Sequence, residues 1–402
     1  MHCVISLKGS QITTLQKKDI MKIGILTLPL HTNYGGILQA YALQTVLTRM
    51  GHEVEIFNKN KPHSRHRNIE MPFVFFVRFV KKYLFRKKTD VFAEKKALQE
   101  RIAISRNIIP FIDKHMKVVN VDRLSKTFAK DYDAIIVGSD QIWRKNYFIY
   151  WWPNFEDAFL RFTKDLNIKR IAYAPSFGVD DWRLNSIETI KVSALLKSFD
   201  AISVRECSGV ELCRRYLNVE VQHVLDPTML LDFNNYLLDI DCSKYIKSNS
   251  NTIMSYVLDE NESSIRLIES VSSFMGLRIN KTNVQCENNH IPVEERVQPA
   301  LEGWLSGFVG AEYVITDSFH ACVFSILSHT PFIVVGNNKR GNSRFNSLLS
   351  WFNLQSRLCD VRDINHCIHI LNSPIDWDAI ESKLIELRNN SIEFLNRALS
   401  NR

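Results

Sequence analysis

The chain alternates short, strongly apolar runs with amphipathic segments, and this alternation restricts the fold more than any other feature. Residues 22–28 (KIGILTL) form one apolar run, residues 37–50 have the apolar spacing of one helix face, and residues 54–57 form a second run. A strand, a helix and a second strand in this order make a βαβ unit, which builds parallel sheets. We therefore predict an α/β protein.

Further apolar runs extend this pattern along the chain. We predict more strands at 134–137, 170–173, 201–205, 221–225, 253–258, 277–280, 313–316 and 332–335. A polar stretch at 233–250 separates the two sets. We therefore predict two Rossmann-like domains, residues 21–232 and 250–360, that face one cleft. A helix at 376–400 is expected to pack back on the N-terminal domain.

Size and cysteine usage restrict the class of protein. A chain of 402 residues is too long for one ordinary core. We expect residues 1–20 to be a flexible leader, because the apolar run Cys3–Leu7 is shorter than a signal-peptide core. No apolar run approaches the about 20 residues that span a bilayer. The eight cysteines form no C-x-x-C pair, so we expect reduced thiols, no metal and a cytoplasmic location.

The formal net charge of +8 is concentrated in one insertion, residues 59–90. Between Lys59 and Lys88 the chain has ten basic residues and one acid, so the remainder is close to neutral and nucleic-acid binding is not indicated. Residues 71–88 read MPFVFFVRFVKKYLFRKK. This interleaving of apolar residues and cations predicts either peripheral contact with anionic lipid or an amphipathic helix packed on the N-terminal domain.

Glycine and polar residues follow the predicted strands, where parallel sheets bind ligands. The first loop contains Asn33, Tyr34, Gly35 and Gly36. Paired glycines let a ligand approach backbone N–H groups at a helix N-terminus, although a tight turn is the alternative. The loop lacks the G-x-G-x-x-G pattern, so no nicotinamide cofactor is indicated.

A second loop follows the predicted strand at 134–137. It contains Gly138, Ser139, Asp140 and Gln141. Carboxylate and amide side chains can bind sugar hydroxyls, so we predict a substrate contact here. The alternative is an ordinary helix N-cap by Ser139 or Asp140.

Charged side chains at three later strand ends are the candidates for chemistry. Arg205 ends a strand and suits a two-contact clamp on phosphate or carboxylate, or a salt bridge with Glu206. His320 begins a helix that Asp317 or Ser318 can cap, and it is either a general acid/base or a packed residue. The next strand is followed by three cations, Lys339, Arg340 and Arg344.

Five motifs occur in order between residues 22 and 354. They are NYGG-x-LQAYAL, DYDAIIVGSDQIW, AISVRE, HVLDPTMLL and VITDSFHACVFSIL. In this order they resemble the polysaccharide pyruvyl transferase family. The resemblance implies a GT-B-like fold, phosphoenolpyruvate as donor and a saccharide as acceptor, in the synthesis of capsule, exopolysaccharide or another cell-surface glycan. It implies no redox cofactor and no metal.

The resemblance also assigns roles to individual residues. Arg205 matches the arginine of the V-R-[DE] motif. His320 approximates the histidine of S-x-x-H, although it follows Ser318 by two positions rather than three. The third residue of the family is usually a lysine before an apolar residue and a helix; Arg344 best fits that context, with Lys339 and Arg340 as competitors.

These roles give one hypothesis for catalysis and leave two rivals. His320 would protonate the methylene carbon of phosphoenolpyruvate, while the cations neutralise its carboxylate and phosphate. A lipid-linked acceptor would place the protein at the inner face of the membrane. The rivals are a GT-B glycosyltransferase with a nucleotide-sugar donor and a non-catalytic assembly protein.

Overall fold

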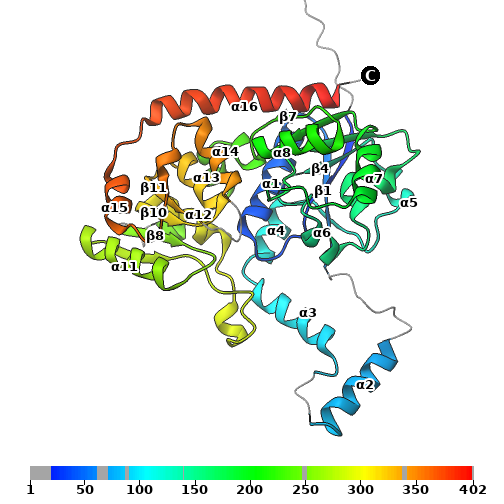
Figure 1. The fold of residues 1–402 in the computed structure, drawn as a ribbon, viewed down its shortest axis with the longest axis horizontal. Helices are drawn as coiled ribbons and strands as arrows, with labels where there is room; N and C mark the ends of the chain where they lie inside the picture. The colour runs from blue at the N-terminus through cyan, green and yellow to red at the C-terminus, as the bar shows by residue number, and fades with distance from the viewer. Residues whose placement is uncertain are drawn as a thin grey trace, which may run out of the picture.

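The computed structural model describes residues 20–60, 71–86, 90–138, 140–246, 251–336 and 342–400. The predicted leader, apart from Ile20, lies outside the described residues. The described chain forms two parallel sheets with helices around them (Figure 1), which confirms the predicted α/β class.

The first sheet has seven parallel strands in the order β3-β2-β1-β4-β5-β6-β7. Its strands are β1 Lys22–Leu26, β2 Glu53–Asn58, β3 Val118–Asn120, β4 Ala134–Gly138, β5 Lys169–Tyr173, β6 Ala201–Val204 and β7 Gln222–His223. Strand order reverses direction beside β1, the kind of switch point at which open α/β sheets bind ligands.

The second sheet has five parallel strands in the order β12-β11-β10-β8-β9. Its strands are β8 Thr252–Tyr256, β9 Arg278–Lys281, β10 Ala311–Thr316, β11 Phe332–Val335 and β12 Leu358–Cys359. β8, β10 and β11 are apolar and largely buried, because helices cover both faces of a parallel sheet.

Helices connect the strands and cover the sheets. The helices are α1 Tyr34–Arg49, α2 Met71–Tyr83, α3 Ala93–Ile104, α4 Ile109–His115, α5 Lys126–Ala129, α6 Lys145–Trp151, α7 Ser186–Leu196, α8 Cys207–Leu212, α9 Phe233–Asp239, α10 Ser243–Ile246, α11 Glu262–Met275, α12 Leu301–Gly310, α13 Phe319–Leu327, α14 Ser343–Trp351, α15 Ile364–Asn372 and α16 Trp377–Leu399. Helix α1 is buried over most of its surface and connects β1 to β2.

One continuous apolar core runs from α1 in the first half to α12 and α13 in the second. Tyr34, at the start of α1, stacks on Trp304 of α12 with ring centroids 5.3 Å apart. Tyr236 of α9 contacts Phe324 of α13 at 5.0 Å. Aromatic side chains bury large areas, so these contacts hold the two halves against each other.

The C-terminal helix α16 crosses from the second half back to the first (Figure 1). Ser391 accepts a hydrogen bond from the backbone of Leu225, 3.1 Å away, and Phe394 contacts Tyr173 of β5. Arg388 donates to the carbonyl of Met229 at 3.0 Å. The helix therefore fastens the end of the chain to the first sheet.

Local structure differs in detail from the predicted pattern. Residues 93–115 form two helices, α3 and α4, because Pro110 stands in the first turn of α4, where proline starts a helix but cannot continue one. The stretch 233–250 is not a plain polar linker, since its helix α9 buries Tyr236 fully. The three-residue strand β3 is too short to show a pattern in the sequence.

Helix α2 does not pack on the N-terminal domain, contrary to one of the two alternatives for residues 71–88. Instead α2 and α3 form an arm that extends from the rest of the molecule (Figure 1). Phe73 of α2 is 69% exposed and Phe76 is 64% exposed. Residues 61–70 and 87–89 of this insertion lie outside the described residues.

We predict that Leu395→Ala lowers the free energy of unfolding by about 2–5 kcal/mol, since Leu395 of α16 is fully buried in the shared core. Ile385→Ala on the same helix is the matched control, because Ile385 is 48% exposed. Urea unfolding followed by circular dichroism measures both. An equal loss in the two variants would contradict the fastening role of α16.

Candidate functional site

Arg205 is the centre of a buried charged cluster at the carboxyl edge of the first sheet. It follows β6 and is 2% exposed. Its Nη1 donates to Asp226 Oδ2 at 2.6 Å, and its Nε donates to Glu206 Oε1 at 3.0 Å. Burial alone would lower the pKa of Arg205, but the carboxylates of Glu206, Asp226 and Asp140 raise it, so the guanidinium stays charged.

His320 comes to this cluster from the second sheet. It lies in the first turn of α13, directly after β10, and the hydroxyl of Ser318 accepts from Ala321 N at 3.5 Å to cap that helix. His320 Nε2 lies 3.7 Å from Asp226 Oδ2, an ion-pair distance that is too long for a hydrogen bond. The same carboxylate oxygen therefore lies near a basic side chain from each half of the chain.

Gly35 makes room for His320. A Cβ atom at Gly35 would overlap the imidazole ring of His320, whereas a Cβ at Gly36 would meet only Asn33 Nδ2 at 3.1 Å. The close approach therefore requires glycine at position 35. Tyr34, Gly35 and Gly36 were expected in a loop, but they form the first turn of α1, which meets α13 at this point.

Arg344 is the third cation of the cluster. It stands in the first turn of α14 and is 6% exposed. Its guanidinium lies 5.8 Å from the ring centroid of Phe319, and the guanidinium of Arg205 lies 4.4 Å from the same ring. Burial and the neighbouring charge of Arg205 lower the pKa of Arg344 to about 10.

Asp226 and Glu206 form the acidic side of the cluster. Burial by itself raises the pKa of Asp226, but His320 and Arg205 lower it far below its usual value, so the carboxylate remains ionised. Thr228 donates to Asp226 Oδ1 through its backbone N–H at 3.0 Å and its hydroxyl at 2.6 Å. Asp226 is thus held rigidly between the two halves.

Three nitrogen atoms in the cluster are buried and make no hydrogen bond within the described part of the chain. They are Arg205 Nη2, His320 Nε2 and Arg344 Nε. Buried donors are normally paired, because an unmade hydrogen bond costs free energy. Three such nitrogen atoms on basic side chains fit an anionic ligand that accepts hydrogen bonds.

The first loop contributes unequally to this cluster. Asn33 Nδ2 donates to Asp140 Oδ2 at 3.2 Å, and Asp140 Oδ1 lies 4.0 Å from Arg205 Nη2. Tyr34 instead points into the shared core, where its hydroxyl donates to the carbonyl of Pro299 at 2.7 Å. The contacts of Tyr34 are therefore packing contacts between the halves and not contacts with the cluster.

The second loop bends sharply at the end of β4. Asp140 has a positive φ of 48°, and no helix follows it directly, so the N-cap alternative is wrong for Asp140. A Cβ at Gly138 would lie 2.9 Å from the carbonyl of Tyr173. Gln141 Oε1 accepts a hydrogen bond from Arg144 at 2.8 Å. Among the described residues, no hydrogen bond joins Gln141 to the cluster.

Ser139, Lys339 and Arg340 lie outside the described residues. Of the three competing cations, Arg344 is the one that the described chain places beside Arg205. The strand ends were expected to line an open cleft, but the cluster side chains are buried where the two halves touch.

Sequence reasoning missed Asp226 and Phe319 as members of the cluster, whereas the predicted salt bridge between Arg205 and Glu206 is confirmed at 3.0 Å. Asp226 is in the motif HVLDPTMLL, three positions after the end of β7 and directly before a proline. This position at a strand end was a usable signal. Its pairing with Arg205 depends on the adjacency of β6 and β7, which the sequence does not display.

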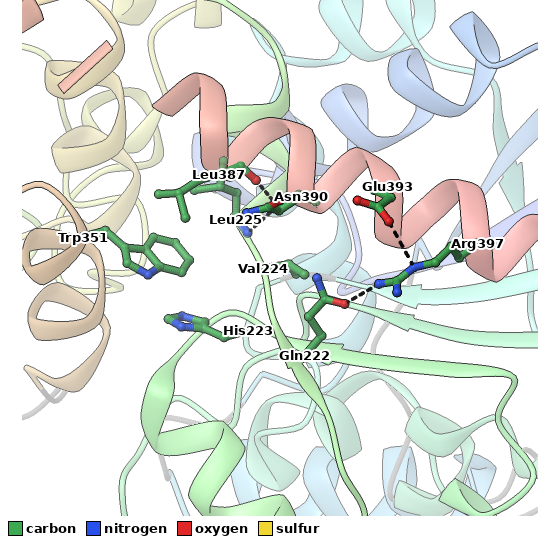
Figure 2. Close-up of a pocket in the computed structure, with 10 residues that line it drawn as sticks. Gln222, His223, Val224, Leu225, Trp351, Leu387, Asn390, Glu393 and Arg397 are labelled. Carbon is green, nitrogen blue, oxygen red and sulfur yellow. Dashed lines mark hydrogen bonds and ion pairs between the residues drawn. The ribbon is translucent and has the colours of Figure 1, made fainter. Parts of the chain in front are cut away.

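A separate hollow lies between β7, α14 and α16 (Figure 2). It has a volume of about 260 Å³, and Trp351, His223 and Arg397 are among its lining residues. His223 stacks on Trp351 at 4.1 Å, and its Nε2 lies 3.0 Å from the carbonyl of Arg205. These contacts support the backbone that carries Arg205.

The two-sheet architecture is similar to that of solved glycosyltransferases. A glycosyltransferase from Rickettsia africae superimposes with a TM-score of 0.50 at 11% identity, covering 95% of this chain and 96% of its own. UDP-GlcNAc 2-epimerase from Methanocaldococcus jannaschii gives a TM-score of 0.44 at 11% identity, covering 88% of this chain and 94% of its own. The two parallel sheets and the similarity to the Rickettsia africae glycosyltransferase give a GT-B-like fold, as predicted.

A family comparison then gives the particular group of proteins. Residues 33–339 match the family described as polysaccharide pyruvyl transferase, so the chain belongs to that family, as its motifs indicated. The protein is accordingly a transferase. No curated protein matches the sequence.

We predict that Arg344→Met raises the midpoint of thermal unfolding. The pKa of Arg344 is about 10 in the folded protein, below its unfolded value, so its charge opposes folding at pH values below 10. Arg357→Met is the control with the opposite sign. Burial lowers the pKa of Arg357 too, but its guanidinium donates to the carbonyls of Phe332 and Ser373, and the substitution removes both hydrogen bonds. Destabilisation by Arg344→Met would contradict this account.

Proposed function

We propose that the protein transfers the enolpyruvyl group of phosphoenolpyruvate to a saccharide and closes a pyruvate ketal on it. The single observation that carries this proposal is the set of three buried nitrogen atoms on Arg205, His320 and Arg344 that make no hydrogen bond to the described residues. Phosphoenolpyruvate has a carboxylate and a phosphate on adjacent positions, which match two guanidinium groups and an acid.

In this proposal the two arginines bind the donor. Asp226 and Glu206 engage Nη1 and Nε of Arg205, which leaves Nη2 for an oxygen of the ligand. Arg344 offers Nε from the opposite domain. Two cations that repel each other when the site is empty become favourable once an anion lies between them, and they stabilise the leaving phosphate.

His320 is the proposed general acid. It donates a proton to the methylene carbon, and the adjacent carbon becomes electrophilic. A sugar hydroxyl adds there, phosphate leaves with its electron pair, and a second hydroxyl of the same sugar closes the ketal. The two hydroxyl protons go to the departing phosphate and back to His320. Asp226, 3.7 Å from Nε2, stabilises the imidazolium between turnovers.

The acceptor is the less defined partner. We propose a saccharide destined for a cell-surface glycan, carried on a lipid and modified at the cytoplasmic face of the membrane. Glycosyl transfer from a nucleotide sugar is the alternative function, and it shares the GT-B-like fold. The two functions differ in the donor, so a donor assay separates them.

We predict that the protein releases inorganic phosphate from phosphoenolpyruvate when a saccharide acceptor is present. His320→Ala should lower turnover about 10²–10⁴-fold, the usual contribution of one general acid. His366→Ala, at an exposed position on α15, is the matched control and should keep wild-type turnover. Full activity of His320→Ala would reject the acid role, and activity with a nucleotide sugar alone would favour glycosyl transfer.

We also predict that Gly35→Ala lowers turnover about 10²-fold. The new methyl group would overlap the imidazole of His320 and push it out of the position from which it donates its proton. Gly36→Ala is the control, since only the movable amide of Asn33 lies near its Cβ. The phosphate-release assay compares both variants. Equal rates for the two would show that the position of His320 does not depend on Gly35.

A further inference from the structure

The arm formed by α2 and α3 presents an apolar surface that the described chain leaves uncovered. Five aromatic or aliphatic side chains along α2 and just after it are at least 60% exposed: Phe73, Phe76, Tyr83, Leu84 and Phe85. Positions 73, 76, 83 and 84 share one face of a helix. We call this set the aromatic face of α2. Exposed apolar patches of this kind mark interaction surfaces.

The opposite side of α2 is fixed to the rest of the arm. Phe75 contacts Phe92 at 5.1 Å, just before α3 begins. The guanidinium of Arg78 donates to both carboxylate oxygens of Glu94, at 2.6 and 2.8 Å. These contacts orient α2, so the aromatic face points away from α3.

Cations border the aromatic face, and no acid occurs between residues 71 and 89. Lys81, Lys82 and Arg86 are exposed, and the sequence continues with Lys87 and Lys88. Apolar side chains flanked by cations complement a surface that is apolar inside and negatively charged at its rim. A bilayer that contains anionic lipids has both properties.

We infer that the arm docks the protein on an anionic lipid bilayer, with the aromatic face of α2 inserted among the headgroups and the cations on lipid phosphates. Insertion is peripheral: no helix among the described residues is long and apolar enough to cross a membrane. Long cationic side chains can keep their charges in the headgroup layer while α2 lies in the interface.

The base of the arm adjoins the segment that packs against the start of α1, next to Gly35. Glu100 of α3 pairs with Arg296 at 3.0 Å, and the carbonyl of Ile104 accepts from Gln298 N at 2.8 Å. The next residue, Pro299, accepts the hydrogen bond from Tyr34 in the first loop. If the proposed function holds, a docked arm brings an acceptor on a lipid carrier to the protein that modifies it.

Vesicle flotation of the full chain, without donor or acceptor, tests the docking. Wild-type protein should float with vesicles that contain phosphatidylglycerol and stay unbound with pure phosphatidylcholine. Phe73→Ser/Phe76→Ser should lose flotation. Ile187→Ser/Ile190→Ser is the matched control and should float like wild type, because these two isoleucines of α7 are 68% and 70% exposed on another surface.

A second pair of variants tests the charges. Lys81→Gln/Lys82→Gln/Arg86→Gln should lose flotation on phosphatidylglycerol vesicles. Lys130→Gln/Lys164→Gln/Lys197→Gln removes the same net charge from exposed positions elsewhere and should keep it. If both triple variants lost flotation equally, or both kept it, binding to the vesicles would not depend on the cations of the arm, and the inference would be overturned.

Two further outcomes would overturn the inference. One is no flotation of the wild type. The other is a dimer, seen by light scattering and abolished by Phe73→Ser/Phe76→Ser, which would assign the face to a second copy of the chain. Phosphate release with a water-soluble saccharide should be unchanged in all the arm variants, so failure of docking and failure of the proposed transferase reaction are distinguishable.

Discussion

The buried carboxylate of Asp226 is the interaction on which the site depends. One of its oxygens accepts from Arg205 of the first half and faces His320 of the second, and its other oxygen is held by Thr228. An ionised carboxylate cannot be buried without such partners. The two halves therefore meet at this carboxylate, and each half places a basic side chain beside it.

The rest of the structure supports this meeting point. Tyr34 and Trp304 hold the two halves together, and α16 fastens the second half to the first sheet. Gly35 lets the imidazole of His320 lie against the start of α1. The arrangement also buries a second arginine, Arg344, near Arg205, which is unfavourable because Arg344 Nε makes no hydrogen bond to the described residues. Sites commonly retain such unfavourable charge because a ligand compensates it.

Much of this arrangement could be predicted, for physical reasons that differ by residue. Buried parallel strands appear in the sequence as apolar runs, so the alternation of strands and helices and the presence of two sheets could be predicted. Arg205 and His320 could be predicted as site residues because they follow the ends of strands. Tyr34 could not be assigned to the core, because its direction is set by how the halves pack. Asp226 was missed because its partner Arg205 is 21 positions away in the sequence. The two residues meet only because β6 and β7 are neighbours in the sheet, and no local sequence pattern predicts the order of strands in a sheet.

Calorimetric titration with phosphoenolpyruvate tests the central claim, that the cluster binds an anionic donor, most directly. The account predicts binding by wild type and by the control Arg161→Met, whose exposed guanidinium pairs with Asp157 instead, and loss of binding in Arg344→Met. Inorganic phosphate should compete. Unchanged binding by Arg344→Met, or binding of a nucleoside diphosphate in place of phosphoenolpyruvate by the wild type, would contradict it.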